Sequence, residues 1–97
     1  MAKNVTATIS AENTFSNKIM LQGYFNISVS AAGGSSISLQ RSFDAGSNWV
    51  DVKITPDDMT TAAVAEYMAY EPEAEVYYRI GVKTGNYVGA ATVRLSK

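Results

Sequence analysis

The chain has 97 residues, of which 46% are hydrophobic and only 18% are charged, a size typical of one domain with a weakly charged surface. Eight basic and nine acidic residues give a net charge of -1 with no run of Lys or Arg, so neither nucleic acid nor a membrane surface is expected as a partner. The absence of cysteine and histidine removes disulfides, thiolate chemistry and the usual zinc and copper ligands, and we expect no cofactor.

We expect residues 1–97 to form a single β-sandwich domain. The opening residues Met1 to Asn4 contain no apolar core of the kind found in signal peptides. No stretch approaches the roughly 20 apolar residues that a membrane helix requires. The expected site of synthesis is therefore a cytoplasm.

The dominant pattern in the first half of the chain is the alternation of apolar and polar residues. It predicts strands over 5–9 and 25–29, each with one buried face. Residues 16–18 are typical of a turn, and 19–21 predict a short strand before Gly23. The stretch 31–36, Ala-Ala-Gly-Gly-Ser-Ser, predicts a hairpin connection to a strand that begins at Ile37.

The second half continues the pattern. A turn over 44–48 leads into a strand over 50–54, which ends at Pro56-Asp57-Asp58. Residues 59–70 tolerate either helix or strand, and we favour a strand over 64–70. The turn at Glu71-Pro72-Glu73 precedes a β-rich strand over 76–82 that we place centrally in its sheet.

The last strand is expected within 88–95, after a turn over 84–86, with Val93 and Leu95 facing inward. The chain therefore predicts an all-β fold, a sandwich of about seven to eight antiparallel strands, immunoglobulin-like or Greek-key in arrangement.

The most specific local pattern is the sequence from Ser42 to Trp49, which resembles the Asp-box hairpin. An Asp44 carboxylate can accept backbone N–H groups within the turn, and Gly46 can adopt positive φ. Trp49 can cover the turn with a large apolar ring. Asn48 stands where the box has threonine, and a single box predicts a structural turn, so Ser42, Asp44, Gly46 and Trp49 are expected to have a structural role.

No residue set predicts catalysis. The acidic residues Glu66, Glu71, Glu73 and Glu75 lack the spacing of a calcium loop, and a solvated edge or a surface for a basic partner is favoured over a metal site. There is no histidine base and no Gly-x-Ser-x-Gly nucleophile motif. We expect that the protein is not an enzyme and has neither catalytic nor metal-binding residues.

Several aromatic side chains could instead form a binding surface. Those not assigned inward are Tyr24, Trp49, Tyr67, Tyr70, Tyr77 and Tyr87. Tyr and Trp are also ordinary half-buried residues of sandwiches, with polar tips at the rim, so both readings stay open.

Three stretches, 10–15, 39–52 and 78–87 followed by 93–96, resemble small virion-associated proteins of tailed bacteriophages. The resemblance implies a capsid decoration, or cement, protein on the head exterior that bridges capsomers. Its expected partner is the major capsid protein, its expected state a homo-oligomer, most simply a trimer, and its expected location the virion surface after synthesis in a bacterial host. Expected contact points are Tyr77, Tyr87, Gly33 and Gly34, together with the N-terminal segment and the loop at Gly85-Asn86.

A second hypothesis stays open. The chain could be a carbohydrate- or receptor-binding module of a phage tail fibre or baseplate, with Trp49 and outward tyrosines as stacking platforms.

Overall fold

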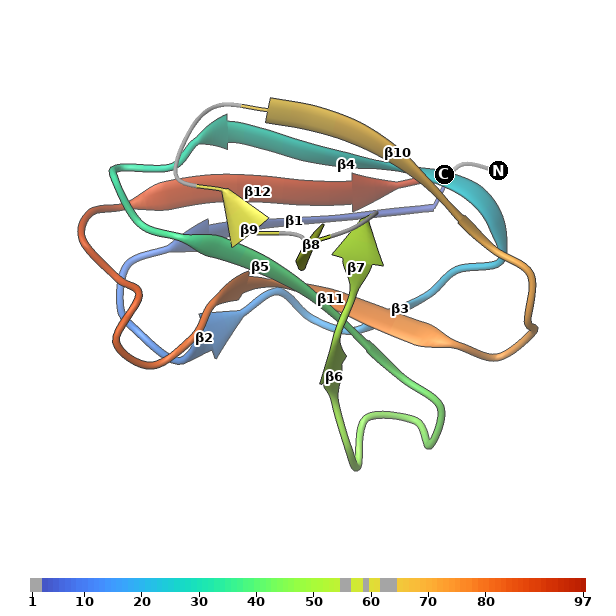
Figure 1. The fold of residues 1–97 in the computed structure, drawn as a ribbon. Helices are drawn as coiled ribbons and strands as arrows, with labels where there is room; N and C mark the ends of the chain where they lie inside the picture. The colour runs from blue at the N-terminus through green and yellow to red at the C-terminus, as the bar shows by residue number, and fades with distance from the viewer. Residues whose placement is uncertain (1–2, 55–56, 59, 62–64) are drawn as a thin grey trace.

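The computed structural model describes residues 3–54, 57–58, 60–61 and 65–97. Every regular element in these residues is a strand (Figure 1). No helix in the described ranges is long and apolar enough to span a membrane. The strands form two packed antiparallel sheets, which confirms the predicted all-β sandwich.

Sheet A contains the first and last strands of the chain. Its order is β1 (Asn4–Ile9), β12 (Ala91–Ser96), β4 (Gly23–Ala31) and β10 (Ala65–Glu71). All neighbouring strands run antiparallel. The β12–β4 pairing shifts register between Thr92 and Val93.

Sheet B faces sheet A across the core. Its order is β2 (Thr14–Phe15), β11 (Tyr77–Val82), β5 (Ile37–Ser42) and β6 (Val50–Asp51). Two further short strands join it, β3 (Ile19–Met20) on β11 and β9 (Thr60–Thr61) on β5. A separate ribbon pairs β7 (Lys53–Ile54) with β8 (Asp57–Asp58).

The strand order is that of a jelly roll, a double Greek key. β2 and β3 pair with successive parts of β11, so they act as one interrupted strand. The chain then passes from β1 in sheet A to sheet B, back to β4, across to β5 and β6, and alternates again through β10, β11 and β12. An immunoglobulin sandwich would place the last strand beside β11, whereas here β12 lies between β1 and β4.

Ser16 explains the break between β2 and β3. Its backbone N–H donates to the Ile80 carbonyl at 2.8 Å, and its hydroxyl accepts the Ile80 N–H at 3.1 Å. A side chain thus replaces a backbone acceptor in the ladder, so the predicted turn over 16–18 interrupts the strand without releasing it from β11.

The core lies between the sheets and follows the predicted alternation. The side chains of Val76, which directly precedes β11, and of Tyr78, Ile80 and Val82 on β11 are buried, and Phe25 packs on Tyr78 with ring centroids 4.6 Å apart. The other buried apolar residues are Ile9, Leu21, Ile27, Val29, Ala32, Ile37, Leu39, Ala91, Val93 and Leu95. Alternation therefore identified the buried face over 5–9, 25–29 and 76–82, whereas β5 also buries the polar residues Ser38, Gln40 and Ser42.

Three predicted segments differ in detail. The favoured strand over 64–70 is present as β10, which begins at Ala65 and continues to Glu71, and the short strand β9 also lies in the ambiguous stretch. Met59, Val64 and the predicted stop at Pro56 lie outside the described residues. The last strand begins at Ala91, because Val88 belongs to an exposed connection. The strand predicted over 50–54 divides at Val52, whose N–H donates to Leu39.

The outer edge of β1 presents peptide groups to its surroundings. Lys3 and Lys97 exchange both backbone hydrogen bonds, so the register makes Val5, Ala7 and Ile9 the hydrogen-bonded positions toward β12. The N–H and C=O groups of the intervening residues point to the other side. No described strand pairs with that side of β1.

Candidate functional site

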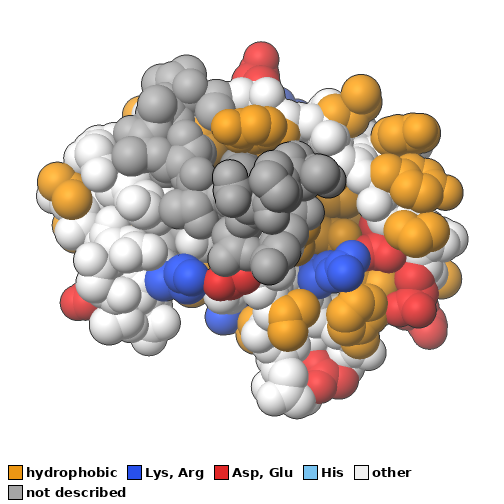
Figure 2. Space-filling model, in the orientation of Figure 1, with side chains coloured by type: hydrophobic (Ala, Val, Ile, Leu, Met, Phe, Trp, Pro, Cys, Tyr) orange, Lys and Arg blue, Asp and Glu red, His pale blue; other side chains and the backbone are white. Residues whose placement is uncertain are grey.

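Three large apolar side chains lie together on the outer face of sheet A. Tyr24 and Tyr70 are directly opposite on β4 and β10, with ring centroids 4.8 Å apart. Met68 precedes Tyr70 by two positions and shares its face. Tyr24 is 66% exposed, Met68 68% and Tyr70 57%, so these three side chains form an apolar patch that faces solvent. Figure 2 shows hydrophobic side chains gathered at the end of the molecule where β10 leads into β11.

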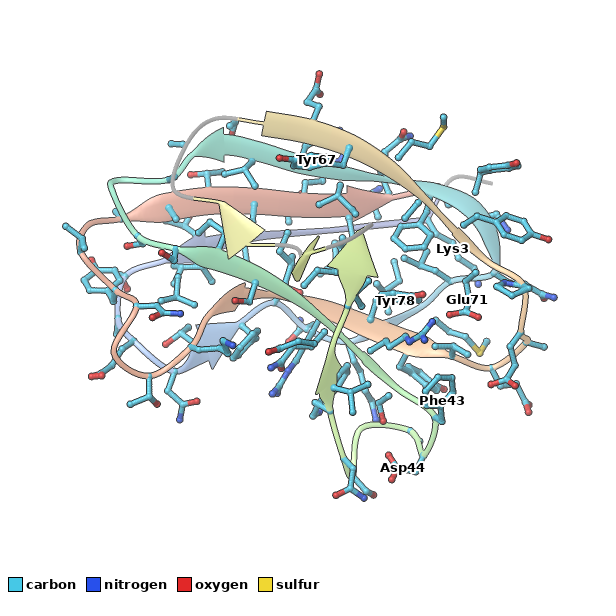
Figure 3. The ribbon with its side chains drawn as sticks, in the orientation of Figure 1. Lys3, Phe43, Asp44, Tyr67, Glu71 and Tyr78 are labelled. Atoms are coloured by element: carbon cyan, nitrogen blue, oxygen red, sulfur yellow. The ribbon has the colours of Figure 1, made fainter. Side chains whose placement is uncertain are left out.

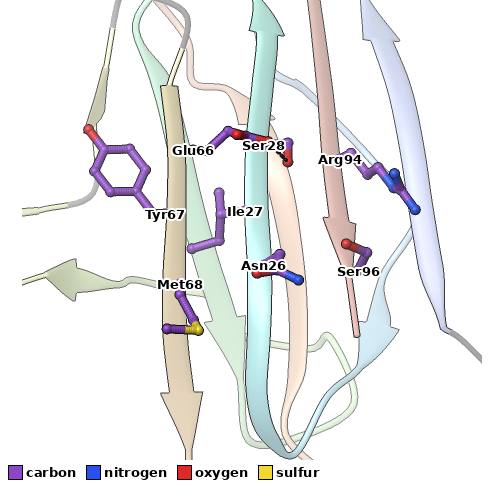
Figure 4. Close-up of a pocket in the computed structure, with 8 residues that line it drawn as sticks. All are labelled: Asn26, Ile27, Ser28, Glu66, Tyr67, Met68, Arg94 and Ser96. Carbon is purple, nitrogen blue, oxygen red and sulfur yellow. Dashed lines mark hydrogen bonds between the residues drawn. The ribbon is translucent and has the colours of Figure 1, made fainter.

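The rest of this sheet face carries little charge. The outward residues of β1, β12 and β4, apart from Tyr24, are Asn4, Thr6, Thr8, Thr92, Arg94, Ser96, Asn26, Ser28 and Ser30. Next to the apolar patch, four of these residues, Asn26, Ser28, Arg94 and Ser96, line a shallow hollow of about 540 Å³ (Figure 4). Glu66 and Met68 lie at its β10 side. Glu66 accepts a hydrogen bond from the Ser28 hydroxyl at 3.4 Å.

The outer face of sheet B holds an arginine between two aromatic rings. The Arg79 guanidinium carbon lies 4.1 Å from the Phe15 ring centroid and 4.4 Å from that of Trp49. Its Nε donates to Gln40 Oε1 at 2.9 Å, and Arg79 and Gln40 are direct cross-strand partners. Desolvation lowers the pKa of Arg79 from its ordinary value, yet the group stays cationic at neutral pH.

A polar chain continues from Gln40 across β6. Gln40 Nε2 donates to Asp51 Oδ1 at 3.0 Å, and Lys83 Nζ lies 2.8 Å from Asp51 Oδ2. Hydrogen bonds from Lys83 and Gln40 lower the pKa of Asp51. A hollow of about 520 Å³, which we call the arginine hollow, opens beside this chain, lined by Asn13, Phe15, Gln40, Arg79, Lys83, Thr84 and Asn86.

The Asp-box-like turn forms its own hydrogen-bond network. The Ser42 hydroxyl donates to Asp44 at 2.6 Å and accepts the Gly46 N–H at 2.8 Å. The Asp44 carboxylate accepts the backbone N–H and side-chain amide of Asn48 at 2.9 and 2.7 Å. Hydrogen bonds from Ser42 and Asn48 lower the pKa of Asp44 to about 2. Gly46 has φ of 101°, and a Cβ there would lie 3.4 Å from Cζ2 of Trp49.

Trp49 is therefore engaged within the chain. The Arg79 guanidinium packs against the indole ring of Trp49, and the edge of that ring lies close to Gly46. The indole is therefore half-buried. Trp49 thus covers the turn and orients Arg79, and this position is less suited to stacking against a sugar ring.

The acidic residues near β10 separate into different environments. Glu71 is buried and accepts hydrogen bonds from the Tyr78 hydroxyl at 2.6 Å, from Arg41 at 3.1 Å and from the Glu73 N–H at 3.0 Å (Figure 3). Burial and the Glu71 hydrogen bond raise the pKa of Tyr78. Within the described ranges no group of three acidic side chains is suited to hold a metal ion. Glu71 thus links sheet A to sheet B.

The residues expected to contact partners also have intrachain roles. Tyr77 lies half-buried beneath Lys18, whose Nζ is 5.2 Å from the ring centroid, and Tyr87 packs against the core. A Cβ on Gly33 would lie 2.4 Å from the Ala90 carbonyl oxygen, and one on Gly34 would lie 3.3 Å from Val88. The Gly33-Gly34 loop is therefore packed on the 88–90 connection.

Sequence reasoning passed over Phe15, Gln40, Arg79 and Lys83. Within its own strand Arg79 only alternates with buried residues, whereas the side chains that it contacts, Phe15 and Gln40, come from β2 and β5. Lys83 likewise pairs with Asp51 of β6. Only the strand order brings these residues together, and the alternation within any one strand carries no signal for it.

Comparison with known proteins finds no matching family model, no similar curated protein and no similar solved structure. The jelly-roll fold serves capsid proteins, lectins and enzymes alike, so function has to be argued from the surfaces.

Proposed function

We propose that this protein is a structural decoration protein of a tailed bacteriophage, which binds the capsid exterior and bridges capsomers. The observation that carries the proposal is the apolar patch of Tyr24, Met68 and Tyr70 on a sheet face with few charges. The partner is the major capsid protein, and the location is the virion surface.

The chemistry of the face suits a protein partner. Aromatic residues and Met are enriched in interface cores, whereas Lys, Glu and Asp are depleted there. The two tyrosines bury large areas at a small cost in side-chain entropy. Around them the Ser, Thr and Asn side chains of β1, β4 and β12 supply the polar rim typical of such surfaces.

Several copies would strengthen weak contacts. A homotrimer presents three apolar patches to one capsid, and the effective concentration of the second and third contacts raises retention. Closed symmetry would also cover an open strand edge such as that of β1. Sedimentation of the purified protein at several concentrations tests this state, and a monomer at all of them would contradict the trimer.

The capsid proposal is tested by reconstitution. Heads of the encoding phage that lack this protein are mixed with the purified chain, and bound protein is measured after sedimentation. The double variant Tyr24→Thr/Tyr70→Thr keeps β-forming residues in both strands and should bind at least tenfold more weakly. Val88→Ser changes an equally exposed apolar residue elsewhere, and it should bind like the unaltered chain.

A map of the intact particle separates head from tail. Density for the jelly roll on the head exterior, with the apolar patch toward the capsid, is the expected result. Its presence only in the tail fibre or baseplate, or its absence from purified virions, would contradict the proposal.

A further inference from the structure

The guanidinium of Arg79 is held in a fixed orientation with hydrogen-bonding capacity to spare. The Phe15 and Trp49 rings lie within 4.1 and 4.4 Å of its central carbon, and Gln40 occupies Nε. A guanidinium has five N–H donors, and among the described residues only Nε has an acceptor. Within the described part of the chain the Nη edge therefore has no acceptor and is open to a ligand.

The strand pairing explains why the arrangement is rigid. Phe15 lies opposite Gly81, whose missing side chain leaves room for the ring next to Arg79. Gln40 is oriented in turn by Asp51, its cross-strand partner, which accepts the amide N–H₂. The guanidinium is thus held by side chains of β2 and β5 and by Trp49, so little conformational entropy is lost when a ligand binds it.

The charge of the arginine hollow suits a monoanion. Lys83 is paired with Asp51, so Arg79 supplies the remaining positive charge among the lining residues. Glu12 is not among the lining residues, and its carboxylate is engaged by the Gly85 N–H at 3.2 Å. A carboxylate matches the planar, two-donor edge of a guanidinium and carries a single negative charge.

The remaining lining residues are polar and uncharged. Asn13, Thr84 and Asn86 provide amide and hydroxyl groups around a space of about 520 Å³, within the range of small-ligand sites. Such groups can hydrogen-bond to sugar hydroxyls, and the hollow is open enough to admit one unit of a longer chain.

From these observations we propose that the arginine hollow binds the carboxylate of an acidic sugar unit, with the Nη edge of Arg79 as its anchor. Asn13, Thr84 and Asn86 contact the ring hydroxyls of that unit. The site lies on sheet B, whereas the apolar patch lies on sheet A, so this inference is independent of the proposed capsid contact.

The test uses a galacturonate trisaccharide and the full chain. Calorimetry gives the affinity, and the fluorescence of Trp49, the sole tryptophan, reports occupancy because its ring lies beside Arg79. We expect saturable binding with a change in Trp49 emission. The neutral galactose trisaccharide should bind at least tenfold more weakly, because it lacks the carboxylate.

Two variants locate the site. Arg79→Lys keeps the charge but loses the planar donor pair, and it should weaken binding at least tenfold. Asn13→Asp adds a carboxylate to the rim without changing size, and Asp tolerates the φ of 51° found there. It should weaken binding by a similar factor while the stack on Arg79 stays intact. Arg94→Lys on sheet A and Asn17→Asp outside the hollow are the matched controls and should bind normally.

Other outcomes would overturn the proposal. These are equal affinity for the neutral trisaccharide, binding by both variants within twofold of the unaltered chain, or equal loss in the controls. Tighter binding of a sulfated trisaccharide or of a Glu-containing peptide would also reject an acidic sugar as the ligand, and would assign the Arg79 edge to a different anion.

Discussion

Gly81 and Thr14 approach so closely that a side chain at residue 81 has no space. A Cβ on Gly81 would lie 2.2 Å from the Thr14 carbonyl oxygen and 2.6 Å from the Phe15 Cα. Because these are backbone atoms, rotation of a side chain cannot relieve the clash. The short strand β2, and with it the Phe15 ring over Arg79, depends on glycine at this position.

The substitution Gly81→Ala should therefore lower the free energy of unfolding by about 2–3 kcal/mol, as overpacking does when backbone must move. Gly85→Ala is the matched control, because a Cβ there meets no atom within 4 Å. Its φ of 86° should cost about 1 kcal/mol. Urea denaturation measures both, and a cost for Gly81→Ala no larger than for Gly85→Ala would contradict the close approach.

Removal of the buried carboxylate should be more damaging than loss of any one of its donors. Glu71→Ala leaves the Tyr78 hydroxyl and Arg41 without their acceptor, so we expect a loss of about 3 kcal/mol. Tyr78→Phe leaves two donors on Glu71 and should cost about 1–2 kcal/mol. Exposed Glu73→Gln should stay within about 0.5 kcal/mol. Thermal or urea unfolding that ranks Glu73→Gln with Glu71→Ala would contradict the link between the sheets.

The Asp44 turn should make stability depend on acid. The pKa of Asp44 in the folded chain is about 2, below the value of about 3.9 expected when unfolded. The stabilisation of the fold by ionised Asp44 is complete above the pKa of the unfolded chain, and it is lost as the pH falls from about 4 toward 2. The stability difference between the unaltered chain and Asp44→Asn should therefore shrink over that interval.

Carbon NMR of the Asp44 carboxyl checks the cause of this acid dependence. In Asn48→Ala, which removes the side-chain donor at 2.7 Å, the pKa of Asp44 should rise toward its ordinary value. An unchanged titration in that variant would show that the amide of Asn48 does not hold the carboxylate.

Proline substitution should distinguish the two sides of β1. The N–H of Ala7 points toward Val93, so Ala7→Pro removes a ladder bond and should cost about 2–4 kcal/mol. The N–H of Thr6 points to the outer edge, so Thr6→Pro should cost about 1 kcal/mol or less. Hydrogen exchange provides a second check, because the Thr6 amide should exchange much faster than that of Ala7. Equal protection of the two amides would mean that another strand covers the edge.

The sequence alone determined the fold class and most of the buried faces. In 5–9, 25–29 and 76–82 the alternation of apolar and polar residues marks the inward side, because a strand turns successive side chains to opposite faces. The turn chemistry of Ser42, Asp44 and Gly46 was equally local. These features depend on neighbours within about five residues, which is the range over which sequence patterns carry structural information.

Tertiary structure alone decided the rest. The order of strands separates a jelly roll from an immunoglobulin sandwich, and it depends on pairings between residues far apart in the chain. Glu71 was grouped with exposed acidic residues, yet it is buried because Arg41 and Tyr78 reach it from sheet B. Arg79 similarly contacts Phe15 from β2 and Trp49 from the end of the Asp-box-like turn. Alternation specifies which way a side chain points, but only the packing of strands specifies what it meets.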